Sequence, residues 1–315
     1  MAEFDLIARI AARAASRSDV VLGIGDDAAL LRVPAGKLLA VATDTLNAGV
    51  HFPVDTAAGD IGWKALAVNL SDLAAMAAQP AWCTLALSLP QADGAWLEDF
   101  LDGFLALADA HALALVGGDT TRGPLSVCVT VHGFVDADTA LRRDGARVGD
   151  EVWVSGTLGD AAGALAQWRA GQAGDAELFA RLRRPVPRIA LGLALAGKAH
   201  AAVDVSDGLL ADLGHVCRAS GVAAELEVDA LPASSALQAA FDPAVRRSLQ
   251  AGGGDDYELC FTAAADAREA VQRSARDTGV AITRVGRIVA GVGVRAVLAD
   301  GSQWTPPQDG YVHFT

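Results

Sequence analysis

Six short clusters in this sequence pair aspartate with glycine, serine or threonine. They read GIGDD at 23–27, TDT at 43–45, NLSD at 69–72, GGDTT at 117–121, DVSDG at 204–208 and GGGDDYE at 252–258. TDT and GGDTT directly follow apolar runs of strand length at 38–42 and 112–116. Polar groups at the carboxyl ends of strands are a common site location in α/β proteins. The clusters therefore predict an α/β protein with functional groups at its strand ends.

The segments around these clusters alternate between helix and strand candidates. Helices are expected over 3–16, 60–78, 95–111 and 189–196, and strands over 38–42, 82–89, 112–116, 125–135 and 151–155. Strands and helices are mixed, which predicts an α/β or α+β architecture. No repeat of fixed period occurs, which excludes a solenoid. A polar stretch at 136–150 is the best candidate boundary, and it predicts two domains, 1–140 and 141–315.

The helix expected over 60–78 is apolar nearly all round, which predicts that it is buried. Lys64, Asn69 and Asp72 lie within it and need partners. Lys64 and Asn69 are expected to cap the helix or to support neighbouring site residues. An unpaired buried carboxylate at Asp72 would be costly enough to protonate or to recruit a cation.

Composition and charge narrow the possible functions. The chain has 315 residues, 52% hydrophobic and 20% charged, the balance of a globular protein. Its formal net charge of −13 would repel a nucleic-acid backbone, so no nucleic-acid partner is expected. Four cysteines without a C-x-x-C pair favour buried free thiols over a zinc site. No basic, apolar leader and no apolar run of about 18 residues occurs, so a cytoplasmic protein without a membrane partner is expected.

The acidic clusters are suited to magnesium chemistry when they are taken together. A single Asp-Gly or Asp-Asp pair is most often a turn. Several such clusters converging on one site would supply the oxygen ligands that Mg²⁺ requires. In phosphoryl transfer such ions neutralise phosphate oxygens, and no nucleophilic side chain is needed, so no catalytic nucleophile is predicted. The sequence lacks G-x-x-x-x-G-K-[ST] and the H-R-D kinase segment, so a nucleotide must be held another way.

The ordered motif series resembles that of the thiamine-monophosphate kinases, within the aminoimidazole ribonucleotide synthetase-like superfamily. The matching segments are GIGDDAALL, ATDTLNAGVHF, KALAVNLSDLAAM, GGDTTRGPLSV, VDVSDGLLADLGH and GDDYELCFT. The similarity covers nearly the whole chain, through the closing residues 310–314. Single motifs also occur in aminoimidazole ribonucleotide synthetase and selenophosphate synthetase, whereas NAGVHF at 47–52 and DYELCFT distinguish the thiamine family.

The resemblance implies a two-domain α/β fold in which the N-terminal domain forms a β-barrel with its copy in a homodimer, and ATP lies between the halves. It implies phosphorylation of thiamine monophosphate by ATP with several Mg²⁺ ions. The matching metal positions are Asp27, Thr43, Asp44, Asp72, Asp119, Asp204 and Asp207. The matching ATP positions are Gly118, Asp119, Arg143 and Ser206, and the matching substrate positions are His51, Asp255 and Gln308.

Three positions depart from the family pattern. Ala42 replaces a frequent hydroxyl residue, Asp255 replaces a glutamate, and Gln308 replaces an aromatic residue for which Trp304 or Tyr311 could substitute.

The alternative for Arg143 is a solvated linker arginine, and for His51 a loop histidine whose protonation nothing local fixes. Another ATP-dependent synthetase of the superfamily and a non-catalytic nucleotide-binding scaffold are the competing functions.

Overall fold

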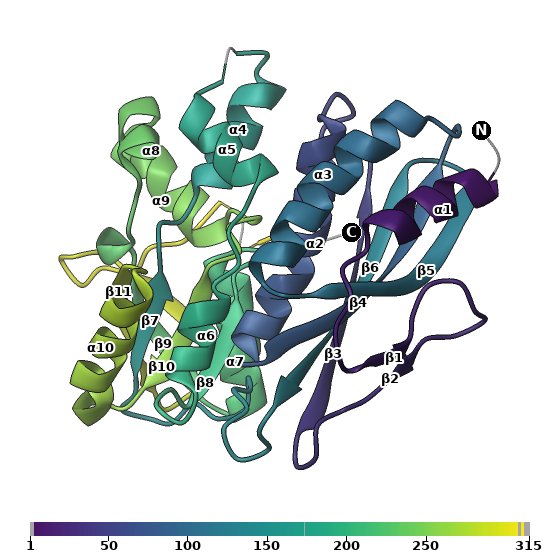
Figure 1. Ribbon diagram of the computed structural model, residues 1–315. Coiled ribbons are helices and arrows are strands. Elements are labelled where there is room, and N and C mark those ends of the chain that lie inside the picture. The colour runs from purple at the N-terminus through teal and green to yellow at the C-terminus, as the bar shows by residue number, and fades with distance from the viewer. Residues whose placement is uncertain (1–2, 173, 308–309, 312–315) are drawn as a thin grey trace. The chain divides into compact units, whose positions relative to one another are not determined.

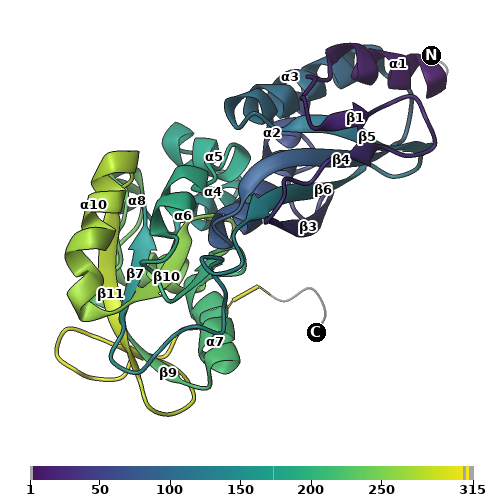
Figure 2. The same ribbon diagram turned by 60° about the horizontal axis from the view of Figure 1, so that its bottom comes forward.

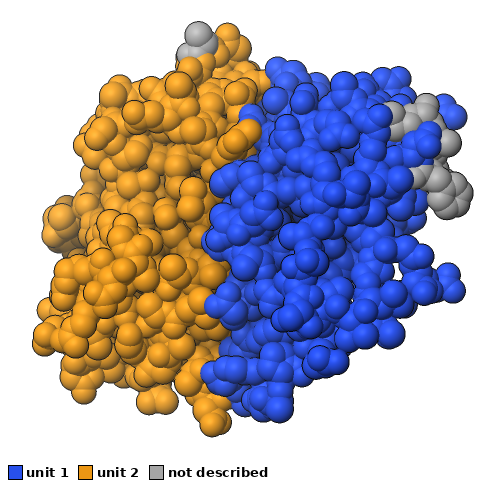
Figure 3. Space-filling model, viewed as in Figure 1, with its two compact units in different colours: residues 1–73, 78–137 blue, residues 74–77, 138–315 orange. Residues whose placement is uncertain are grey.

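The computed structural model describes residues 3–172, 174–307 and 310–311, and its elements are labelled in Figure 1. The chain divides into two compact units, coloured in Figure 3. Unit 1 comprises residues 1–73 and 78–137, and unit 2 comprises residues 74–77 and 138–315. The roles of the predicted domains, 1–140 and 141–315, stay a prediction.

Unit 1 is built on a four-stranded sheet. Its elements are α1 (Glu3–Arg13), β1 (Val20–Leu22), β2 (Leu30–Leu31), β3 (Leu38–Asn47), α2 (Ala58–Ala75, its last two residues in unit 2), β4 (Gln79–Leu89), α3 (Gly94–Ala110), β5 (Ala114–Arg122) and β6 (Ser126–Val135). The strand order is β3-β6-β4-β5, with β4 and β5 parallel and the other pairs antiparallel. Strands β1 and β2 form a separate antiparallel pair.

One face of this sheet is covered by helices α2 and α3 (Figures 1 and 2). Burial alternates along β6, where Val127, Val129 and Val131 are fully buried and their neighbours are half-exposed. This period of two is what a sheet with one covered face produces. Within the described part of unit 1 the sheet is open, with β3 and β5 at its edges, and no closed barrel forms. The barrel expected from the resemblance is therefore not a property of the single chain.

Unit 2 carries a six-stranded sheet. Its elements are β7 (Glu151–Ser155), α4 (Asp160–Arg169), α5 (Ala176–Arg183), α6 (Ile189–Leu195), β8 (Ala201–Asp204), α7 (Leu209–Ser220), β9 (Ala223–Glu227), a 3-10 turn (Val228–Ala230), α8 (Ser235–Ala240), α9 (Pro243–Gly252), β10 (Leu259–Ala263), a 3-10 turn (Ala265–Ala267), α10 (Arg268–Thr278), β11 (Ile282–Val289) and β12 (Gly293–Val297). The strand order is β12-β9-β11-β7-β10-β8, and only β12 and β9 are parallel. The predicted mixture of helices and strands is confirmed.

Two predicted strands are longer than the sequence suggested. The strand expected over 38–42 continues as β3 to Asn47, and the strand expected over 112–116 becomes β5, which runs to Arg122. The ladder to β6 is unbroken from Leu38↔Val135 to Asn47↔Ser126, so TDT lies inside a strand. Polar residues can continue an edge strand because its outer side faces solvent. The prediction that these two clusters follow their strands was therefore wrong.

No helix in the described ranges is both long and apolar enough to span a bilayer. All four cysteines are free; Cys128 is half-buried, and the other three are buried. The prediction of buried free thiols is thus confirmed for Cys83, Cys217 and Cys260. Burial raises the pKa of each of these three thiols, because the thiolate is disfavoured away from water.

Candidate active site

Strand β3 presents Thr43 and Asp44 at one edge of the unit 1 sheet. The Thr43 hydroxyl lies 2.9 Å from that of Thr130 on β6, and the Asp44 backbone N–H donates to Asn69 Oδ1 at 2.9 Å. Asn69 is fully buried on α2, and its amide nitrogen also donates to Ala65 O. Asn69 therefore ties helix to strand from mid-helix and supports the predicted site residue Asp44, so of its two expected roles the structure shows support and not capping.

Asp119 and Gly118 lie on β5, at the opposite edge of the same sheet. Gly118 has φ +153°, and a Cβ there would lie 1.9 Å from Leu85 O, so only glycine fits beside β4. Asp119 is exposed and pairs with Ala86 across the ladder. Three strand spacings of about 4.8 Å each separate β5 from β3. One chain therefore does not bring Asp119 together with Thr43 and Asp44.

The loop after β3 positions His51. Its Nδ1 accepts a hydrogen bond from the Asn47 N–H at 3.0 Å, and its carbonyl accepts one from Lys64 Nζ at 3.1 Å. The Asn47 N–H therefore places the proton of the neutral imidazole on Nε2 and fixes the tautomer of this ring. Lys64 is 2% exposed within α2, so it anchors this loop and does not cap the helix.

Three further predicted residues lie apart from these groups along the chain. Asp27 is exposed in the turn after β1, where its N–H donates to Asp26 Oδ1 at 2.8 Å. Asp72 is half-buried near the end of α2. Arg143 is exposed in the segment before β7, and its carbonyl accepts from the Ser220 hydroxyl at 2.8 Å. The segment that carries Arg143 is therefore fixed, while its guanidinium is accessible.

In unit 2 the structure brings two of the predicted clusters side by side. The backbone N–H of Asp255 donates to Ser206 O, that of Tyr257 to Val205 O, and that of Val205 to Glu258 O, each at 2.8 Å. The ladder pair Leu259↔Asp204 continues this contact into strands β10 and β8. DVSDG and GGGDDYE are thus joined by backbone hydrogen bonds, although about 50 residues separate them in the sequence.

Asp212, which was not among the predicted site residues, holds the backbone of the DVSDG cluster in place. Its Oδ2 accepts from the backbone N–H groups of Ser206, Asp207 and Gly208 at 3.0–3.1 Å. Burial, followed by repulsion from the carboxylates of Asp204 and Asp207, raises the pKa of Asp212 to about 7. The sequence signal was its place four residues after Gly208, in the first turn of α7, where a carboxylate can accept free N–H groups.

The donor set of these clusters suits magnesium. Carboxylates and a threonine hydroxyl are hard oxygen donors, and the crowding of Asp204, Asp207 and Asp212 would be relieved by a cation. Within the described ranges no three His, Cys, Asp or Glu side chains are arranged to hold an ion by themselves. Mg²⁺ in phosphate-binding sites usually takes one or two carboxylates and fills its shell with phosphate oxygens and water.

Asp255 lies at the outer side of the same unit 2 site. It is half-exposed, and the Tyr257 hydroxyl donates to its Oδ1 at 3.0 Å. Tyr257 is a second residue that the sequence analysis missed; its position beside the predicted Asp255 was the only signal. The Tyr311 N–H donates to Asp207 O at 2.9 Å, which places the closing segment at this cluster. Gln308 lies outside the described residues.

Two family models match the chain, one over each half. AIR synthase related protein, N-terminal domain, matches residues 25–135, and AIR synthase related protein, C-terminal domain, matches residues 147–299. The fold and the acidic clusters thus define an AIR synthase related protein.

Full-length relatives narrow this class. The thiamine-monophosphate kinase of Salmonella typhimurium is 48% identical over 318 residues, which cover 99% of this chain and 98% of that protein. The crystal structure of thiamine-monophosphate kinase from Stenotrophomonas maltophilia has 58% identity and a TM-score of 0.89, and the match covers 96% of this chain and 98% of that one. AaThiL complexed with AMPPCP and TMP has 31% identity and a TM-score of 0.79, with 99% and 96% covered. The chain belongs to the thiamine-monophosphate kinase family.

Proposed function

We propose that this chain transfers the γ-phosphate of ATP to thiamine monophosphate, giving ADP and thiamine diphosphate by direct in-line transfer. The observation that carries the proposal is the hydrogen bond between Asp255 and Ser206, which joins an acceptor position to a nucleotide position. AaThiL, which matches 99% of this chain, is complexed with AMPPCP, an ATP analogue, and with TMP. A nucleotide and the acceptor are the two ligands that the resemblance predicts for Ser206 and Asp255.

The residue roles follow the same proposal. Mg²⁺ ions are held by Asp27, Thr43, Asp44, Asp72, Asp119, Asp204 and Asp207; ATP is bound by Gly118, Asp119, Arg143 and Ser206; and the acceptor is bound by His51, Asp255 and Gln308. Bound Mg²⁺ neutralises the phosphate oxygens during transfer. Arg143 supplies a guanidinium to a phosphate, and its exposure leaves it free to do so. The protein binds and aligns, and no side chain forms a covalent intermediate.

A homodimer through unit 1 belongs to the proposal. Leu38, Leu39 and Val41 on the edge strand β3 are 54%, 42% and 55% exposed, which is unusual for three large apolar side chains on one strand. A second copy on the sheet edges would cover them and could close the open sheet into a barrel. It would also allow Asp119 of one copy to approach the β3 residues of the other, which a single chain keeps apart.

The remaining assignments complete the proposal. Residues 1–140 form the metal-binding, ATP-binding and dimerisation domain, and residues 141–315 form the α/β domain that completes the site. The enzyme acts in the cytoplasm.

Product analysis tests the proposal directly. The protein is incubated with ATP and thiamine monophosphate, with Mg²⁺ or with EDTA, and thiamine diphosphate is separated by chromatography. Product that forms only with Mg²⁺ supports the kinase. ATP binding without any thiamine diphosphate would contradict it and would favour a non-catalytic scaffold or another acceptor.

A further inference from the structure

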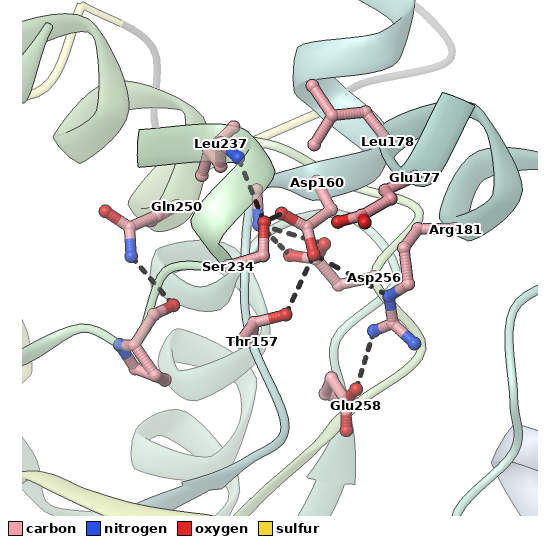
Figure 4. A network of polar contacts seen from close by, with 12 residues as sticks. Thr157, Asp160, Glu177, Leu178, Arg181, Ser234, Leu237, Gln250, Asp256 and Glu258 are labelled. Carbon is pink, nitrogen blue, oxygen red and sulfur yellow. Dashed lines mark hydrogen bonds and ion pairs between the residues drawn. The ribbon is translucent and has the colours of Figure 1, made fainter. Parts of the chain in front are cut away.

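A buried network of charged groups lies beneath the 252–258 turn of unit 2 (Figure 4). Asp160, Asp256 and Glu258 are 2%, 3% and 0% exposed. Arg181 Nη2 lies 2.6 Å from Glu258 Oε1, and its Nε lies 3.8 Å from Asp160 Oδ2. Arg188 Nε donates to Glu258 Oε2 at 2.6 Å. No residue of this network is among the predicted site residues.

Glu258 is bound from three elements at once. Arg181 comes from α5, Arg188 from the residue before α6, and the Ser155 hydroxyl at the end of β7 donates to Glu258 Oε2 at 2.5 Å. The same Ser155 oxygen accepts from the Leu259 N–H at 2.8 Å. Charge-assisted hydrogen bonds to a fully buried carboxylate fix its position closely, because any displacement leaves a charge unpaired.

Asp256 is fixed in a similar way at the beginning of α4. Both of its carboxylate oxygens lie 2.9 Å from the Gly159 N–H. Asp160 accepts from the Thr157 hydroxyl at 2.8 Å and the Ser234 hydroxyl at 2.6 Å. Burial raises the pKa of Asp256 well above its ordinary value, because the carboxylate is disfavoured away from water.

The turn above this network is conformationally costly. Asp255 has φ 69° and Tyr257 has φ 50°, and neither is glycine. Side chains rarely tolerate this region, and such residues persist only where their surroundings hold them. Asp256 and Glu258 alternate with these two residues and point into the network. The inward carboxylates thus hold the backbone that directs Asp255 outward and keeps its N–H on Ser206.

We propose that Glu258, through its ion pairs with Arg181 and Arg188, positions Asp255 for the thiamine monophosphate acceptor. This inference rests on the proposed function, because it takes Asp255 as an acceptor-binding residue. Glu258, Arg181 and Arg188 are positioning residues and do not touch the substrate. Their loss weakens acceptor binding, because the 254–258 backbone is freed from its hydrogen bonds to residues 205 and 206.

The test compares Glu258→Gln with a matched control, Glu151→Gln. Glu151 is also buried in this sheet, at 6% exposure, and pairs with two arginines, Arg268 and Arg284, at the other end of β7. Both substitutions keep side-chain shape and remove one buried charge. Hydrogen exchange of the Asp255 and Tyr257 amides and the KM values for acceptor and ATP are measured on both variants.

Glu258→Gln is expected to speed exchange of these two amides at least about tenfold and to raise the KM for thiamine monophosphate about fivefold. The KM for ATP should change less than about twofold, and Glu151→Gln should leave all three quantities near wild type. Arg188→Lys keeps the charge but loses the bidentate contact with the two Glu258 oxygens. It should therefore raise the exchange rate and the KM for thiamine monophosphate by a smaller factor.

Two results would overturn the proposal. Unchanged exchange in Glu258→Gln would show that the network does not hold the turn. Faster exchange with an unchanged acceptor KM would show that the network stabilises the turn without positioning Asp255. If the wild-type protein makes no thiamine diphosphate, the proposed function fails, and the exchange comparison still decides whether Glu258 holds the turn.

Discussion

Replacing Gly103 with alanine tests the close contact between helices α2 and α3. A Cβ at Gly103 would lie 1.8 Å from Gly59 O and 2.7 Å from its carbonyl carbon, whereas ordinary contact begins at 3.4 Å. Because the obstacle is backbone, the two helices would have to separate by more than an ångström. Overpacking of this kind costs about 1–3 kcal/mol. Alanine regains about 1 kcal/mol of helix propensity, so we expect a net loss of up to about 2 kcal/mol, near the upper limit because the obstacle is backbone.

Gly214→Ala on α7 is the matched control. Gly214 also lies within a helix, but a Cβ there meets nothing within 4 Å. It should therefore show the propensity gain alone, about 0.4–1 kcal/mol of stabilisation. The two substitutions add the same methyl group within a helix, and backbone blocks it at Gly103 but not at Gly214.

Urea unfolding followed by circular dichroism gives the comparison. The midpoint should fall for Gly103→Ala and rise for Gly214→Ala, at an unchanged slope with denaturant. If Gly103→Ala stabilises the protein as much as Gly214→Ala does, helices α2 and α3 do not approach as described, and the steric argument fails.

Two further predictions concern the acidic clusters. Asp72→Asn should abolish phosphoryl transfer with little change in the urea midpoint, whereas Asp99→Asn, at an exposed position of α3, should keep activity. Full activity in Asp72→Asn would show that Asp72 is not a metal ligand. The pKa of Asp212 is raised in the folded protein, so between about pH 4 and 7 its carboxyl is protonated in the folded protein and ionised in the unfolded chain. Without Mg²⁺, stability should therefore fall by up to about 1.4 kcal/mol per pH unit as pH rises through this window; an equal slope in Asp212→Asn would contradict this assignment.

Apolar patterns in the sequence were enough to locate most elements of unit 1, whereas in unit 2 the expected ranges matched β7 and α6. Helix α3 and strands β6 and β7 begin and end within one residue of the expected ranges, because apolar residues recur along each of them between polar ends. The ranges expected for the strands that carry polar residues were too short. A prediction that ends a strand at Asp or Gly takes no account of the neighbouring strand with which that segment pairs. At Thr43 and Asp44 that partner is β6, more than 80 residues away.

The same limit explains why the buried network was missed. Arg181 and Arg188 lie in an arginine-rich stretch that resembles a solvated surface segment, and Glu258 is 70 residues or more further along the chain. Nothing local distinguishes an arginine that pairs with a buried carboxylate from one that faces water. Only the fold, which brings Arg181 and Arg188 to Glu258, makes the difference.

The motif GGGDDYE shows how residues of one type can take opposite roles within four positions. Asp255 is half-exposed, whereas Asp256 and Glu258 are buried and hold protein groups. Asp255 and Tyr257 have left-handed backbone conformations, so this segment is not extended, and no period of two in the sequence predicts which side chains face inward. The resemblance to the kinase family identified Asp255, whereas the structure alone shows that Asp256 and Glu258 are buried. The inward carboxylates bind protein N–H groups and guanidiniums, whereas Asp255 is half-exposed and accepts from the Tyr257 hydroxyl.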